Sequence, residues 1–196
     1  MRKGEQTRQG ILETALAEAS MAGLAGLSIG GLAEKVAMSK SGLFAHFHSK
    51  EDLQLQVLHT ARERFIESVI APALQQQRGE PRVQALFDNW LCWSESSYLP
   101  GGCPFVSASV ELDDQPGPLR DYLVQSQKDW LDTLATAARI AQEEGHFHND
   151  LDTDRFAFDF YSIILAYYHF SRLLHDPTTT QRCRSAFADL LKRARV

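Results

Sequence analysis

Residues 27–53 read LSIGGLAEKVAMSKSGLFAHFHSKEDL, and the placing of their serines and apolar residues decides the fold. Ser28 precedes a short apolar helix face, where a serine hydroxyl caps a helix by accepting from a free backbone N–H. Ser39 takes the same place in front of a second helix, in which Leu43 and Phe47 have core-seeking spacing. Two short capped helices joined by a tight turn have the dimensions of a helix-turn-helix.

The leading turn of the second helix suits a negatively charged partner. It holds Ser39, Lys40, Ser41 and Gly42. Free N–H groups and the positive helix end favour phosphate there, and small side chains let the backbone approach closely. With Leu43 and Phe47 directed inward, Lys40, Phe44 and His46 are predicted on the outer side or its rim. The alternative is a small helical cap whose serines only cap helices and whose lysines are solvated; taken alone, His46 equally fits a half-buried core histidine.

The charge distribution agrees with a DNA-binding N-terminus. Over the whole chain the net charge is -5. Residues 1–50 contain six Lys or Arg and four Asp or Glu, a balance of +2, which leaves -7 for residues 51–196. Such an imbalance between segments is typical of a protein with one end that binds a polyanion.

Helical periodicity dominates the rest of the chain, so the fold class is predicted to be all-α. Proline and glycine clusters divide the chain, as in YLPGGCPF and DDQPGPL. Beyond the two short helices, we predict helices from residue 11 to Gly23 or Gly26, over 50–72, from 81 to before Tyr98, over 119–143 and 153–175, and a last one ending near Arg195.

The stretch over residues 27–53 resembles the tetracycline-repressor (TetR) family of bacterial transcription regulators. The shared features are the serine cap, the Ser-led second helix with Phe44 and Phe47, and Ser-Lys-Glu at residues 49–51. The resemblance implies about nine helices, with a three-helix DNA-binding domain over residues 1–52 and a helical effector-binding and dimerisation domain over residues 53–196. It implies DNA contacts from Ser28, Ser39, Lys40, Ser41, Gly42, Phe44, Ala45, His46 and Lys50.

Three residues depart from the family pattern, and two of them, Ala45 and His48, stand where the family often has other residues. Ala37 stands in the turn where the family usually has glycine. If that position needs a positive φ, alanine costs about 1 kcal/mol there.

A dimer is expected, because its two copies of the second helix of the helix-turn-helix, about 34 to 36 Å apart, would contact the two halves of an approximately palindromic DNA site. Apolar residues of the last two helices are the predicted interface: Phe156, Ile163, Ile164, Phe170, Phe187, Leu190 and Leu191. The same residues fit the core of a single protomer, and the two roles are compatible.

The larger domain is expected to bind a small-molecule effector. Aromatic residues and one cysteine are the candidates for the lining of its pocket: Trp90, Trp93, Cys103, Phe105, Trp130, Phe160 and Tyr167. For each of them, packing in the core is the alternative role. Cys103 near a helix start fits either a reactive thiol or a buried inert one.

Several classes of protein do not fit the sequence. No apolar run approaches the roughly 18 residues of a membrane span, and we expect a cytoplasmic protein. Three cysteines without C-x-x-C spacing indicate neither a disulfide framework nor a zinc site, and His146 and His148 are interpreted as part of a solvated loop. Motifs for catalysis are missing, and no cofactor is predicted.

The sequence thus predicts a ligand-responsive regulator, a repressor that releases a pseudo-palindromic operator when a small molecule binds. Its partners would be double-stranded DNA, the effector and a second copy of the chain. The alternative is a helical small-molecule-binding protein that does not bind DNA.

Overall fold

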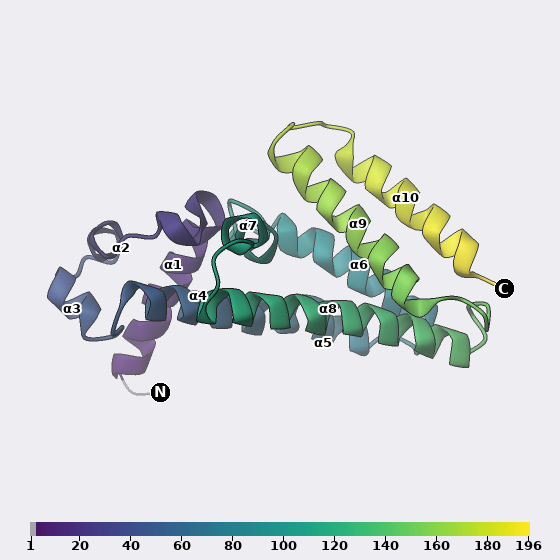
Figure 1. The fold of residues 1–196 in the computed structure, drawn as a ribbon, viewed down its shortest axis with the longest axis horizontal. Coiled ribbons are helices and arrows are strands. Elements are labelled where there is room, and N and C mark those ends of the chain that lie inside the picture. Colours follow the sequence, from purple (N-terminus) through teal and green to yellow (C-terminus); the bar gives the residue numbers. More distant parts are fainter. Residues whose placement is uncertain (1–2) are drawn as a thin grey trace. The chain divides into compact units, whose positions relative to one another are not determined.

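The computed structural model describes residues 3–196, which are helical except for turns and loops (Figure 1). Within them no strand forms, and a single bridge joins Phe147 to Arg195. The helices are α1 Lys3–Gly26, α2 Ile29–Lys35, α3 Lys40–Phe44, α4 Lys50–Phe65, α5 Ala71–Leu74, α6 Glu80–Ser94, α7 Pro104–Leu112, α8 Pro118–Glu143, α9 Thr153–Arg172 and α10 Thr179–Ala194. The predicted all-α class is confirmed, and none of the described helices is long and apolar enough to cross a membrane.

A π-helical turn, Ile66–Ile70, joins α4 to α5 without a break in the helix. Pro72 follows in the first turn of α5, where its missing N–H and its ring disturb the regular hydrogen-bond ladder. Widening of the preceding turn is a usual response to such a disturbance. The helix predicted to end near Pro72 therefore continues to Leu74. With α4, the π turn and α5 counted as one helix, the described residues contain the nine helices that were expected.

The described helices pack into two compact units. Unit 1 contains the described residues up to 65 and residues 95–125, and unit 2 contains residues 66–94 and 126–196. These units describe which segments pack together, whereas the division predicted at residue 52 concerns function and stays a prediction.

The core of unit 1 forms mainly between α1 and α4. The predicted apolar face of α1 is buried and consists of Ile11, Leu12, Ala15, Leu16 and Ala19. Leu53, Val57 and Leu58 of α4 are fully buried against this unit's interior. The three- and four-residue spacing in the sequence was sufficient to identify both faces.

The core of unit 2 is an aromatic cluster. Phe87 of α6 stacks on Phe187 of α10, with ring centroids 4.0 Å apart and planes 10° from parallel. Phe160 of α9 meets both rings edge-on, at 5.8 Å and 5.2 Å. Because one ring from each of three helices is used, the cluster fixes α6, α9 and α10 to one another, and α9 and α10 run side by side in opposite directions (Figure 1).

Unit 2 also contains a polar network that the sequence did not predict. His146 Nδ1 accepts from the backbone N–H of Glu80 at 3.1 Å and so caps the start of α6. Phe147 is fully buried. The interpretation as a solvated loop holds for the exposed His148 but is wrong for His146, which satisfies a helix end, and for Phe147, which enters the core.

The end of α10 is attached to the same network through an ion pair. Arg195 Nε donates to Glu80 Oε2 at 2.9 Å, and a second guanidinium nitrogen donates to Oε1. This hydrogen bond to Arg195 is the main reason why the pKa of Glu80 lies below its ordinary value. Since the folded state holds the carboxylate more strongly than the unfolded chain, the pair stabilises the fold above the ordinary glutamate pKa.

The replacement Glu80→Gln tests this network through its pH dependence. The free energy of unfolding should fall by about 1 kcal/mol at neutral pH, because the introduced glutamine keeps the shape but not the charge. The difference from wild type should shrink as the pH drops through the lowered pKa of Glu80, where both proteins lack the charge. Urea unfolding of both proteins between about pH 3 and pH 7 measures it. A difference that stays constant over this range would contradict the assignment.

Candidate nucleic-acid interface

Both helices of the helix-turn-helix begin at the predicted caps. Ser28 Oγ accepts from Gly31 N at 3.0 Å, and Ser39 Oγ accepts from Gly42 N at 3.0 Å. Both serines have extended backbone conformations, as N-cap residues do. The two helices are short, α2 with seven residues and α3 with five.

The turn between α2 and α3 is a Schellman motif. Ala37 N donates to Glu34 O at 3.2 Å, and Met38 N donates to Ala33 O at 2.9 Å. In this motif the residue after the C-cap takes the left-handed conformation, and Ala37 has φ +52°. The condition under which alanine is costly at this position is thus met, because its Cβ disfavours positive φ.

Burial around α3 is as predicted, although Phe47, which was predicted within this helix, lies beyond its end at Phe44. Leu43 and Phe47 have no exposed surface, whereas the side chain of Phe44 is 49% exposed. Arg8 of α1 lies over the ring of Phe47, with its guanidinium carbon 5.3 Å from the ring centre. The two buried residues hold the helix on unit 1, and the opposite side is left for a partner.

The predicted DNA-contact residues lie on or beside that open side. Ser28, Ser39, Lys40, Ser41, Phe44, Ala45 and Lys50 are exposed, and Gly42 and His46 are half-buried. The side chain of Lys40 packs against α2 at Gly30, where an added Cβ would lie 3.1 Å from Lys40 Cε. The absence of a side chain at Gly30 therefore makes room for the lysine stem.

Lys50 has an intramolecular partner that the sequence did not indicate. Its ammonium donates to the carbonyl oxygen of Ala25 at 2.6 Å. An ammonium group has three donors, so this bond leaves capacity for a phosphate. The phosphate contact predicted for Lys50 remains a prediction.

Two further side chains in this region had no local signal in the sequence. Gln54 of α4 and Glu111 of α7 hydrogen-bond the backbone of the last turn of α1. Their partners lie 30 and 87 residues away along the chain. Helix periodicity relates residues three or four apart, so it gives no information about such pairs.

The predicted effector residues fall into both packing units. Trp90, Trp93, Trp130, Phe160 and Tyr167 belong to unit 2, and Cys103 and Phe105 belong to unit 1. Trp90 meets Tyr167 edge-on at 5.7 Å, and Trp130 meets Phe160 edge-on at 6.3 Å. All four rings are buried, so the structure gives them a packing role in unit 2.

Cys103 and Phe105 lie at the start of α7. Cys103 is buried at the N-cap position of this helix, as its place before Pro104 suggested. Phe105 meets Phe65 of α4 edge-on at 6.1 Å. Within residues 3–196 no group of three His, Cys, Asp or Glu side chains is arranged to hold a metal ion.

Most of the predicted dimer residues are used inside the protomer. Phe156, Ile164, Phe187, Leu190 and Leu191 are each at most 6% exposed and pack in the core of unit 2. Apolar periodicity marks a buried face but does not tell a protomer's own core from a subunit contact. Ile163 and Phe170 instead lie at the surface of the α9–α10 pair.

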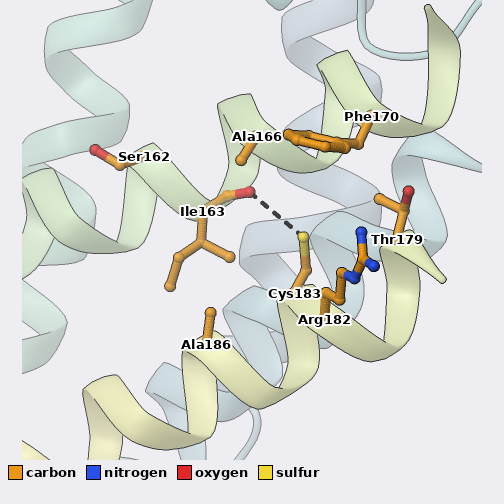
Figure 2. Close-up of a pocket in the computed structure, with 8 residues that line it drawn as sticks. All are labelled: Ser162, Ile163, Ala166, Phe170, Thr179, Arg182, Cys183 and Ala186. Atoms are coloured by element: carbon orange, nitrogen blue, oxygen red, sulfur yellow. Dashed lines mark hydrogen bonds between the residues drawn. The ribbon is translucent and has the colours of Figure 1, made fainter. Parts of the chain in front are cut away.

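A surface pocket of about 340 Å³ lies between α9 and α10 (Figure 2). Its lining consists of Ser162, Ile163, Ala166, Phe170, Thr179, Arg182, Cys183 and Ala186. Cys183 Sγ donates to the carbonyl oxygen of Ile163 at 3.9 Å, and burial raises the pKa of this thiol. The pocket is apolar and contains none of the seven predicted effector residues.

Two family models match the chain. Residues 11–57 match "Bacterial regulatory proteins, tetR family", and residues 79–187 match "Tetracyclin repressor-like, C-terminal domain". The chain belongs to the TetR family. It is therefore a ligand-responsive DNA-binding transcriptional regulator, and the resemblance inferred from residues 27–53 is confirmed.

Solved structures of TetR regulators have the same fold. A TetR regulator from Chloroflexus aurantiacus J-10-FL is 26% identical, with a TM-score of 0.88 and full coverage of both chains. A regulator from Saccharomonospora viridis in complex with choline is 21% identical, with a TM-score of 0.84 and 96% of each chain covered. AibR, in complex with isovaleryl coenzyme A and operator DNA, is 22% identical, with a TM-score of 0.75 and coverage of 96% of this chain and 99% of that one. No curated protein matches the chain in sequence.

The positive φ of Ala37 gives a stability prediction. Ala37→Gly should raise the free energy of unfolding by about 0.5 to 1 kcal/mol, because glycine adopts the left-handed region without a Cβ clash. Ala45→Gly is the matched control, since Ala45 has φ -66° and glycine should destabilise that position. Urea unfolding at constant pH measures both changes. A less stable Ala37→Gly protein would show that the turn does not strain this residue.

Proposed function

We propose that this TetR-family regulator is a homodimeric repressor that releases a pseudo-palindromic operator when a small molecule binds it. Residues 1–52 would bind DNA, and residues 53–196 would bind the effector and the second protomer. The observation that carries the proposal is helix α3, which buries Leu43 and leaves Lys40 and Phe44 exposed. Its leading residues would enter the major groove, as in other helix-turn-helix proteins.

The dimer contact is proposed on the exposed side of α9. This helix buries Phe160 and Ile164 in unit 2, yet it also carries large apolar side chains that are exposed. Phe158, Leu165 and Phe170 are 64%, 40% and 39% exposed there. Exposed apolar side chains on the outer side of a helix are stabilised when another surface buries them. In a symmetric dimer the same side of α9 from the second protomer would bury them.

The pocket between α9 and α10 supports the same interface. Phe170 and Ile163 of α9 contribute apolar surface to the pocket, and the small side chain of Ala186 lines it from α10 (Figure 2). Small residues let a partner helix approach, and an apolar side chain of the second protomer would fill the space. This proposal replaces the buried members of the predicted interface with exposed ones.

The effector site is proposed among the aromatic residues of α6, α8 and α9. The edge-to-face pairs of Trp90 with Tyr167 and of Trp130 with Phe160 offer apolar surface and ring faces. Similar regulators bind choline and isovaleryl coenzyme A, two chemically different ligands. Because the four rings are buried, an effector would have to separate them on entry, and this displacement would begin the response.

DNA binding is tested by the salt dependence of affinity. A labelled duplex selected by the wild-type protein from a random-sequence pool serves as the probe. With about eight phosphate contacts per dimer, log affinity should fall against log salt with a slope near -7. Lys40→Ala should weaken binding and make the slope shallower by about two, one contact for each protomer.

Lys192→Ala on α10 is the control, because it removes the same charge outside the helix-turn-helix. It should leave the slope unchanged. Failure of the wild-type protein to retain any duplex at low salt, with an effector still bound, would favour the small-molecule-binding alternative.

The dimer proposal is tested by a charge on the exposed side of α9. Leu165→Glu should convert the dimer to a monomer, since a buried unpaired carboxylate costs several kcal/mol in an apolar contact. Leu74→Glu is the control, because Leu74 on α5 is 51% exposed and lies outside α9 and α10. Light scattering coupled to size-exclusion chromatography measures the mass. A Leu165→Glu protein that stays dimeric would place the interface elsewhere.

A further inference from the structure

The last turn of α1 leads directly into the helix-turn-helix and has an unusual construction. Gly23 has φ +75°, which interrupts α1 three residues before its end. After this kink, the N–H of Leu24 donates to Glu111 Oε2 at 2.8 Å, and the N–H of Ala25 donates to Glu111 Oε1. One carboxylate from α7 thus binds two successive backbone donors. We call this arrangement the Glu111 cap.

The carbonyl groups of the same two residues are held by α4. Gln54 Nε2 donates to Leu24 O at 2.6 Å in a buried bond, and Lys50 Nζ donates to Ala25 O at 2.6 Å. Both the donors and the acceptors of this dipeptide are therefore bound by side chains. Ser28, which caps α2, follows only three residues after Ala25, so the position of this dipeptide determines where α2 begins.

The segment that carries Glu111 is itself fixed on α1. Gly101, in the loop before α7, donates its N–H to the buried Ser20 Oγ at 3.0 Å. A Cβ at Gly101 would lie only 1.6 Å from the carbonyl oxygen of Ser20, so the two backbones are in close contact. Contacts at Gly101 and at Glu111 hold this segment at two points along α1.

Helix α7 belongs to one domain by sequence and to another unit by packing, so the Glu111 cap connects the two. Helix α7 lies within residues 79–187, which match the C-terminal domain of the family. In packing, however, it belongs to unit 1 together with α1, α2, α3 and α4. A side chain of the domain assigned to effector binding therefore holds the backbone that positions the DNA-binding helices.

We propose that Glu111 is a positioning residue for operator binding, because its carboxylate fixes the last turn of α1 and with it the start of α2. The proposal rests on the proposed function. Hydrogen bonds to a carboxylate are about twice as strong as neutral ones, and two of them fix a direction as well as a distance. A shift of α7 then moves or releases Leu24 and Ala25, and with them the start of α2.

The replacement Glu111→Gln tests the proposal with little change in shape. A glutamine has one acceptor oxygen, so its amide nitrogen would face the second backbone N–H and one bond would be lost. Affinity for the selected operator duplex should fall about tenfold, and affinity for an unrelated duplex of equal length should stay the same. The ratio of the two affinities is the readout, because a partly unfolded protein loses both in proportion.

Asp114→Asn is the matched control. It makes the same change in net charge three residues further along the chain, where Asp114 is exposed. On electrostatics alone, loss of a negative charge strengthens DNA binding, so the expected effect of Glu111→Gln has the opposite sign. Hydrogen exchange should also become faster at Leu24 and Ala25 in Glu111→Gln and not in Asp114→Asn.

The outcomes separate the two proposals. Equal affinity ratios for Glu111→Gln and Asp114→Asn would overturn the role of Glu111 and leave DNA binding intact. A proportional loss on both duplexes would also overturn it, because Glu111 would then act only on stability. A wild-type protein that selects no sequence from the pool would overturn the proposed function, and the role of Glu111 in it as well.

Discussion

The backbone N–H and C=O groups at the end of α1 need hydrogen-bond partners. The side chains that supply these partners connect α1 with α4 and α7 in unit 1. A kinked helix end exposes donors and acceptors that its own ladder no longer satisfies. Here Glu111 accepts from Leu24 and Ala25, while Gln54 and Lys50 donate to the same two residues. Two helices distant in sequence, α4 and α7, are thereby attached to one dipeptide. Because side chains reach only a few ångströms, this bonding restricts how far α4 or α7 can move without displacing the start of α2.

Local chemistry made much of the helix-turn-helix predictable. Ser28 and Ser39 cap their helices because a serine hydroxyl reaches an N–H three residues ahead, a relation that is visible in the sequence. Leu43 is buried because helical spacing puts it on the inner side of α3, whereas Phe47 is buried beyond the end of that helix. The positive φ of Ala37 was raised only as a condition, which the structure meets. The partners of Lys50 and Glu111 were not predictable in this way. They depend on which helices meet in three dimensions, and a single sequence gives no signal for that.

The aromatic residues show a different limit. Periodicity identified the apolar sides of α6, α9 and α10, and Phe87, Phe160 and Phe187 do meet in a core. It could not decide what covers each side, because the same spacing serves a protomer's core, a ligand pocket and a subunit contact. Phe187 was assigned to the dimer and lies inside, whereas Phe158, which was not assigned, is exposed. The exposed fraction of each side chain separates a subunit contact from the protomer's core.

The acidic character of the chain is compatible with DNA binding, because electrostatic repulsion depends on how close each charge comes to the duplex. At physiological ionic strength charges are screened beyond about 8 Å, so a residue that does not approach the duplex contributes little to the energy of the complex. Lys40 on α3 is exposed next to the free side of the helix and can meet a phosphate directly, where screening is weak. The net charge of -5 then acts mainly before contact, when it opposes approach in most orientations. Productive encounters are those in which the positively charged N-terminal segment meets the duplex first, and this selection by orientation favours binding through the helix-turn-helix over nonspecific adhesion.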